Sequence, residues 1–146
     1  MKKILFGALL ALAFLAAVPA HAGPTALPTT PQGAASGGAK VYFNDAVTTA
    51  VQVKATVGQL YSLSLTNTTA ATAYLQVFCK PSASVTLGTT APDFVVRLKT
   101  NAGAGDERDL AFPVGVCSGG TGLTIAGTTT ATGSTTAAVS VMASYF

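Results

Sequence analysis

The sequence predicts an all-β protein, an antiparallel sandwich or barrel of about eight strands. Two observations lead to this prediction. Beyond residue 40 the apolar residues recur with a period of two, as in strands that turn one face towards a core. The segments with this period are short, and stretches of Gly, Thr, Asn, Ser and Pro separate them, with no helical period among them. Short strands at such spacing are typical of antiparallel sandwiches and barrels.

The amino-terminal region predicts a cleaved signal peptide over residues 1–22. The chain begins with two lysines after Met1, continues with an unbroken apolar run over residues 4–18, and then supplies a breaker and small residues at 19–22. Cleavage is expected between Ala22 and Gly23. The fifteen apolar residues are fewer than the roughly 20 that a spanning helix needs. We therefore expect a bacterial protein that is exported to the periplasm, the cell surface or the medium, with no membrane anchor after cleavage.

Cleavage would leave 124 residues, which suits one domain with a modest core. Residues 23–39 are rich in Pro, Gly, Ala and Thr and predict a flexible arm, and residues 40–146 are expected to form the β-sandwich domain. The cleaved chain would contain six scattered Lys and Arg residues and five acidic residues, which gives a net charge of about +1. Nucleic-acid binding needs clustered positive charge, so we exclude that class of function.

The individual strands follow from the local patterns. Valine alternates with polar residues over 47–57, Gly58 and Gln59 permit a turn, and residues 60–66 continue the alternation, so this pair is expected to form a hairpin. Further strands are expected over residues 73–79, 84–87, 94–99, 110–114, 123–126 and 136–145. Val, Leu and Phe should face the core, and threonine should lie on the solvated faces because its branched side chain suits an exposed pleat. The sequence Asn67-Thr68-Thr69 fits a glycosylation pattern but is expected to be an ordinary turn.

Two cysteines, Cys79 and Cys117, remain in the exported chain. Disulfides form and persist in oxidising compartments, and an even count without a third thiol favours a bridge between these two. A closed loop of about 38 residues would stabilise the fold by roughly 4 kcal/mol on the loop-entropy model. The alternative is two separately buried thiols. A metal site is not expected, since the sequence has no CxxC pair and its one histidine, His21, leaves with the signal peptide.

The inventory of reactive groups predicts no enzyme, no catalytic residues and no cofactor. Without histidine, the exported chain lacks the usual general base, and no serine lies in a G-x-S-x-G turn. Three acids, Asp106, Glu107 and Asp109, cluster in a glycine-rich segment between two predicted strands. They could form a weak Ca²⁺ site or a carboxylate pair for glycoside chemistry. We favour a solvated hairpin loop in which Arg108 offsets its neighbours, because the segment has no EF-hand spacing.

Five segments of the expected sandwich domain have a distinctive sequence: ATVGQLYSLSLTN at 55–67, AYLQVF at 73–78, VTLGTTAP at 85–92, FPVGV at 112–116 and GLTIA at 122–126. Together they resemble a family of small tailed-phage virion proteins. The resemblance covers about residues 48–145 and implies a jelly-roll-like sandwich that serves as a head-associated, decoration or fibre component without enzymatic activity. The secretion signal and the cysteine pair depart from that family. Our hypothesis is that an exported bacterial structural protein has acquired a phage-type module.

The carboxyl terminus suggests a pilin-like fimbrial subunit as an alternative. Gly133 lies fourteen residues from the end, Tyr145 is penultimate, and small apolar residues alternate between them, which is similar to the last strand of chaperone–usher pilins. In such pilins a neighbouring subunit donates the strand that completes the sandwich. The simpler interpretation is the closing strand of a complete sandwich.

A secreted carbohydrate-binding module is a further alternative, with a glycan as partner. Sugars stack on aromatic rings, and the sequence has no tryptophan. The aromatic candidates are Tyr42, Phe43, Tyr61, Tyr74 and Phe78. Their alternative role is core packing.

The low content of charged residues points to self-association or to docking into a larger surface assembly. Charged residues make up 9% of the chain, against roughly 25% in typical globular domains. Few charges leave strand edges poorly protected against pairing with other chains. The alternative is an ordinary threonine-rich secreted monomer.

Overall fold

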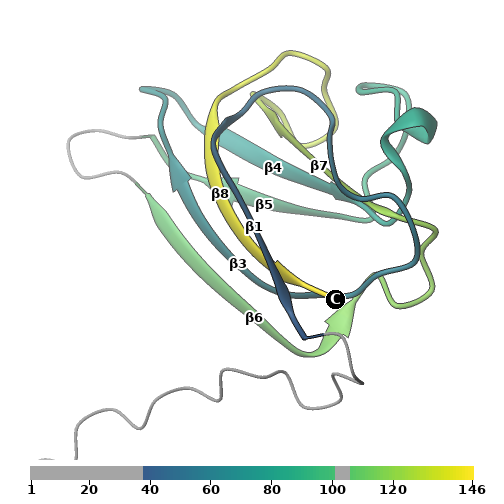
Figure 1. The fold of residues 1–146 in the computed structure, drawn as a ribbon. Coiled ribbons are helices and arrows are strands. Elements are labelled where there is room, and N and C mark those ends of the chain that lie inside the picture. The colour runs from purple at the N-terminus through teal and green to yellow at the C-terminus, as the bar shows by residue number, and fades with distance from the viewer. Residues whose placement is uncertain (1–37, 101–105) are drawn as a thin grey trace, which may run out of the picture.

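The computed structural model describes residues 38–100 and 106–146, which form two antiparallel four-stranded sheets packed face to face (Figure 1). The predicted all-β sandwich is therefore confirmed. The expected signal peptide, its cleavage site between Ala22 and Gly23, and the expected arm up to residue 37 lie outside the described residues. No helix in the described ranges is long and apolar enough to cross a membrane.

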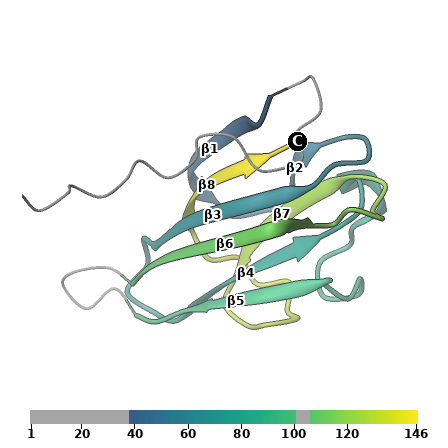
Figure 2. The same ribbon diagram turned by 90° about the horizontal axis from the view of Figure 1, so that it is seen from below.

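Within these ranges the chain forms eight strands and one short 3₁₀ helix. The elements are β1 (Lys40–Val47), β2 (Val51–Lys54), β3 (Leu60–Asn67), β4 (Ala73–Phe78), η1 (Ser82–Ser84), β5 (Phe94–Leu98), β6 (Glu107–Val116), β7 (Leu123–Thr128) and β8 (Val139–Tyr145). The first sheet, which we call sheet A, has the order β1-β8-β3-β6, and sheet B has the order β2-β7-β4-β5. Figure 2 shows the two sheets stacked, with β1 and β6 at opposite edges of sheet A.

The strand pairs are nested along the chain. The first strand pairs with the eighth, the second with the seventh, the third with the sixth and the fourth with the fifth. Two further pairings, β3 with β8 and β4 with β7, join these pairs into the two sheets. The first half of the chain thus folds back along the second half, and successive nested pairs alternate between sheets A and B.

The core lies between the sheets because the strands alternate in polarity as the sequence predicts. In β3 the leucines Leu63 and Leu65 are buried, while the serines between them are only partly covered. Leu75 of β4 and Ile125 of β7 face them from sheet B and are fully buried. Each buried side chain of this size contributes about 1.5–3 kcal/mol through removal of apolar surface from water.

The outer face of sheet B is also covered, which the sequence did not predict. Gln76 of β4 is fully buried, and its Nε2 donates hydrogen bonds to Thr128 Oγ1 at 3.0 Å and to the carbonyl oxygens of Thr130 at 3.3 Å and Gly133 at 3.1 Å. Thr124 Oγ1 donates to the carbonyl oxygen of Lys80 at 2.7 Å. The segments that follow β4 and β7 therefore form a layer over this sheet. The expectation that threonines lie on solvated faces is wrong for Thr124 and Thr128, which are fully buried.

The predicted first hairpin is wrong. The alternating segment 47–57 is split between two strands, since β1 ends at Val47 and β2 begins only at Val51. Strand β2 pairs with β7 in sheet B, whereas β3 pairs with β6 and β8 in sheet A. An alternating pattern indicates which side chains face a core, but a strand in either sheet satisfies it equally well. The alternating pattern therefore could not predict where the chain crosses from one sheet to the other.

The strand expected at 84–87 is also replaced by turns. Helix η1 forms there, with the Ser84 N–H donating to the Pro81 carbonyl at 2.9 Å, and the Thr90 N–H then closes a second turn on the Thr86 carbonyl at 2.8 Å. Gly88 has a φ of 82° inside this second turn, a conformation that favours glycine. Four apolar and polar residues in alternation are too few to specify a strand when turn residues flank them.

Candidate functional site

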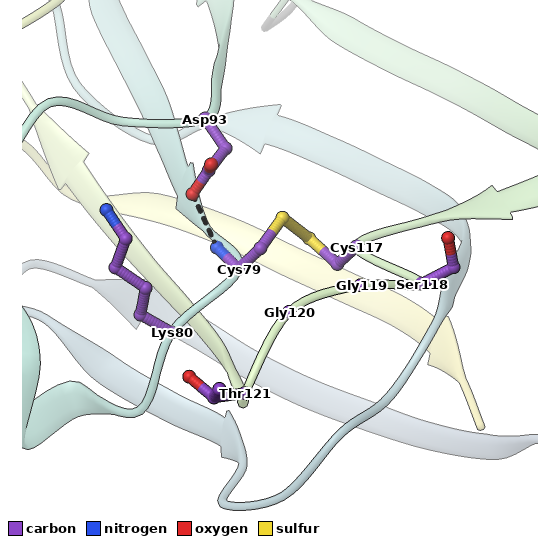
Figure 3. Close-up of a pocket in the computed structure, with 8 residues that line it drawn as sticks. All are labelled: Cys79, Lys80, Asp93, Cys117, Ser118, Gly119, Gly120 and Thr121. Atoms are coloured by element: carbon purple, nitrogen blue, oxygen red, sulfur yellow. Dashed lines mark hydrogen bonds between the residues drawn. A yellow bond between two sulfur atoms is a disulfide. The ribbon is translucent and has the colours of Figure 1, made fainter.

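The predicted disulfide is present and joins the two sheets. Cys79 follows β4 of sheet B, and Cys117 follows β6 of sheet A. Their sulfur atoms are 2.03 Å apart and their Cα atoms 5.0 Å apart (Figure 3). The bridge closes a loop of 38 positions and ties together two strands that share no backbone ladder.

A shallow, open depression of about 510 Å³ lies beside the disulfide. Lys80, Asp93, Ser118 and Thr121 line it together with two glycines, as Figure 3 shows. The Asp93 carboxylate accepts the Cys79 backbone N–H at 2.7 Å, and the Thr121 N–H donates to the Cys79 carbonyl at 3.1 Å. The polar groups around the depression thus hold the backbone on either side of the bridge. We assign this region a structural role.

Glycine at position 120 is required for this close packing. A Cβ atom there would collide with the carbonyl oxygen of Cys79. Gly120 also closes the turn after Cys117, because its N–H donates to the Cys117 carbonyl at 2.9 Å. Cys117 itself has a φ of 67°, which is uncommon for a residue with a side chain. The turn and the bridge therefore constrain each other.

Asp106, Glu107 and Asp109 are not gathered around one point, and in the part of the chain that the structure describes no three His, Cys, Asp or Glu residues are grouped so that they could hold an ion. Asp106 Oδ2 accepts the Lys99 backbone N–H at 2.7 Å and the Arg108 Nε–H at 3.3 Å. The bond from Lys99 is the main reason that the pKa of Asp106 lies below its ordinary value; desolvation opposes this shift, and Arg108 adds to it. Glu107 and Asp109 are exposed on β6.

The segment around these acids crosses between sheets, so the expected hairpin loop is wrong. Strand β5 belongs to sheet B and β6 to sheet A, and the two strands are not paired. The expected charge compensation is present, since Arg108 forms an ion pair with Asp106. The Asp106 carboxylate accepts hydrogen bonds from Lys99 and Arg108, and these bonds hold the chain where it crosses from sheet B to sheet A.

The turn predicted at Asn67 is confirmed. The side chain is fully buried, and its Oδ1 accepts the backbone N–H and the hydroxyl of Thr69, each at 2.9 Å. Its Nδ2 donates to the carbonyl oxygens of Ala71, at 2.8 Å, and of Lys99. With both ends of the amide buried and bonded, this side chain cannot carry a glycan in the folded protein.

Four of the five aromatic candidates for sugar stacking are covered to a large extent. Phe78 is fully buried and Tyr61 is 9% exposed. Tyr42 packs against the core and Tyr74 is partly covered. Phe43 alone among the five presents most of its ring to solvent, with 62% of its surface exposed.

Phe43 belongs to an apolar patch on the outer face of sheet A, formed by Val41, Phe43 and Met142. Val41 is 67% exposed and Met142 is 49% exposed. Phe43 lies directly opposite Met142 in the pairing of β1 with β8. Tyr42 and Asn44 point to the other face of the same strand, where the Asn44 amide donates to the Tyr42 hydroxyl at 3.0 Å. We call Val41, Phe43 and Met142 the edge patch.

Two of the three residues of the edge patch, Val41 and Phe43, lie on β1, which has a neighbour on one side only. The other three edge strands carry the features that discourage pairing with other chains. Strand β6 has three charged residues and Pro113, β2 is four residues long and ends in Lys54, and β5 carries Arg97. In β1 a register shift begins only after Asn44, whose Oδ1 accepts the Ala46 N–H at 2.9 Å. Strand β1 also carries two charged residues, Lys40 and Asp45, but residues 41–44 between them form a regular, uncharged edge with exposed apolar side chains.

Sequence reasoning missed this strand. The signal available was the run Val41-Tyr42-Phe43, three residues of high β-propensity between the expected arm and the valine repeat.

Comparison of the chain with protein-family models, with curated proteins and with solved structures found no match. The resemblance to tailed-phage virion proteins therefore stays a prediction.

Proposed function

We propose that this protein is an exported, non-enzymatic structural subunit of an assembly at the bacterial surface, built on a jelly-roll sandwich of the kind used by phage virion proteins. The nested strand order supports the jelly roll. Eight strands arranged as two Greek keys in two sheets define that architecture, which viral capsid and lectin domains share. The orders β1-β8-β3-β6 and β2-β7-β4-β5 agree with it.

The observation on which the assembly role depends is the exposed edge patch. A regular edge strand with large exposed apolar residues invites pairing with another chain, and monomeric proteins avoid it with charges, prolines or bulges. The other three edges carry charges, a proline or a short length within the strand, whereas β1 has its charges, Lys40 and Asp45, only on either side of the uncharged stretch 41–44. A partner at β1 accounts for this asymmetry.

The disulfide supports export, because such bridges persist in oxidising compartments and are rare in the cytosol. The apolar run over residues 4–18 supplies the targeting signal for that route.

A pilin-type assembly by donated strands has less support. Strand β8 is paired with β1 on one side and β3 on the other, so the chain supplies its own last strand inside sheet A. A glycan-binding role also has less support, because Phe43 is the one aromatic candidate with a largely exposed ring.

The test is fractionation of the native host, followed by electron microscopy and mass spectrometry of the protein-containing fraction. We expect the processed chain, beginning at Gly23, in particles or filaments from the envelope or the medium. A processed protein that sediments as a free monomer in every fraction would contradict the structural role. Recovery of the unprocessed chain in purified virions would contradict export.

A further inference from the structure

We propose that β1 pairs antiparallel with β1 of a second copy of this chain, with Tyr42 at the two-fold axis. The inference rests on the proposed function, since it names the contact through which the subunit begins to assemble. It joins two copies of sheet A into one continuous sheet in which β1 is no longer an edge.

The register follows from which side chains share a face. Residues that lie opposite each other in an antiparallel pair point to the same side of the sheet. Val41 and Phe43 are exposed on the outer face, while Tyr42 packs against the core. With Tyr42 opposite its own copy, Val41 lies opposite Phe43 of the second copy, and Phe43 opposite Val41. Pairs of an aromatic with a β-branched residue are among the favourable cross-strand pairs.

The charges of β1 are compatible with this register. Lys40 lies opposite Asn44 of the second copy, and Asp45 lies opposite Ala39, so no two like charges meet. Like charges placed directly opposite each other would destabilise the pair. The edge is thus complementary to itself in its apolar positions, and its charged positions do not oppose the pairing.

Shifting the register by two residues in either direction separates Val41 from Phe43 of the second copy. With Val41 at the axis, Phe43 would lie opposite Ala39 of the second copy. With Phe43 at the axis, Val41 would lie opposite Asp45 of the second copy, and a carboxylate would replace the aromatic partner. The register with Tyr42 at the axis is the one that matches the exposed apolar residues of both copies.

The contact also extends the edge patch. Met142 lies beside Phe43 in each copy, so Val41, Phe43 and Met142 of the two chains form a single apolar strip across β8, β1, β1 and β8 of the joined sheet. Merging the two patches covers the flanks of the Phe43 rings, which are exposed in the single chain.

The test uses two variants that each add one cysteine to the processed chain, Val41→Cys and Phe43→Cys, purified with the native bridge intact. Opposite residues in an antiparallel pair have Cα atoms about 4.5–5.5 Å apart, which a disulfide spans, whereas positions two residues out of register are about 7–8 Å apart, which it does not. We therefore expect a covalent dimer when the two variants are mixed under mild oxidation, and none from either variant alone.

Light scattering supplies a second measurement that does not depend on cysteine chemistry. The unmodified protein should have twice the monomer mass, and Val41→Lys, which adds a protective charge to the edge, should halve it. Val114→Lys is the matched control, since Val114 is 85% exposed on β6 at the opposite edge of sheet A. It should remain a dimer.

Each other outcome would overturn the pairing. A covalent dimer from Phe43→Cys alone, or from Val41→Cys alone, would show one of the two shifted registers. A monomer with a reactive thiol at position 43 would show an open edge without a partner, and a monomer with an unreactive thiol would show that residues of the same chain cover β1. Native particles or filaments together with any of these results would leave the structural role intact and exclude this contact.

Discussion

The carboxylate of Asp106 accepts the backbone N–H of Lys99, with 2.7 Å between oxygen and nitrogen. Lys99 follows β5, an edge strand of sheet B, and Asp106 precedes β6 of sheet A. The Lys99 carbonyl accepts the amide of Asn67 at the end of β3. These side chains hold one end of the sandwich together, while the disulfide lies at the other end of β6.

Replacing Asp106 by Asn should lower stability at neutral pH, and the difference from the unmodified protein should shrink in acid. The pKa of Asp106 lies below its ordinary value in the folded state. Its stabilising contribution is therefore complete above about pH 4 and is lost as the pH falls through the folded pKa. Denaturant midpoints measured between pH 7 and pH 2.5 check this, with Asp109→Asn as control, since Asp109 is exposed on β6, the strand that Asp106 precedes. A difference that stays constant over this range would contradict the prediction.

Removing the bridge with Cys79→Ser and Cys117→Ser together should cost about 4 kcal/mol, because the unfolded chain regains the freedom of a 38-position loop. Guanidinium unfolding of the double variant and of the reduced, unmodified protein should give similar midpoints. Free reaction of both thiols in protein taken from its native location, without reductant, would show that the bridge does not form in the cell.

Replacing Gly127 by Ala should destabilise the fold by about 3 kcal/mol or more, at the upper end of overpacking effects. A Cβ atom at this position of β7 would collide with the backbone carbonyls of Val47 and Ala137. Gly119→Ala is the matched control, because a Cβ atom there meets nothing within 4 Å. The melting temperature of Gly127→Ala should lie clearly below that of Gly119→Ala. Equal melting temperatures would show that the backbone at Val47 and Ala137 can move away from β7.

Replacing Leu75 by Ala should cost about 2–5 kcal/mol through the lost burial and the cavity left in the core. Leu75 is fully buried in β4, between the two sheets. Val114→Ala, at an exposed position, should change stability by less than about 0.5 kcal/mol. Chemical denaturation of both variants measures this, and a small loss at Leu75 would indicate that the core is loosely packed.

The sequence predicted much of this fold correctly where the evidence was local. The leucine and serine alternation of β3 placed Leu63 and Leu65 in the core, as observed. The pattern failed at Val47, where one alternating run is divided between two sheets. Alternation reports the face of a strand, and a strand facing the core from sheet A has the same pattern as one facing it from sheet B.

The candidate sites also divide into those that could be predicted from local sequence and those that depend on the tertiary structure. The pairing of Cys79 with Cys117 followed from there being two thiols, and the Asn67 turn followed from its neighbours. The exposure of Phe43 could not be foreseen, because it depends on β1 lying at an edge with β8 as its one neighbour.

The sequence by itself determined which side chains of a strongly alternating strand such as β3 face inward and which two sulfur atoms are joined, because the side-chain period and the thiol count are properties of the chain. The tertiary structure alone decided which strands are neighbours, which segments cover sheet B and which edge stays open. Those features depend on backbone pairing between distant segments, such as β1 with β8, and nearly every residue carries the same backbone donor and acceptor.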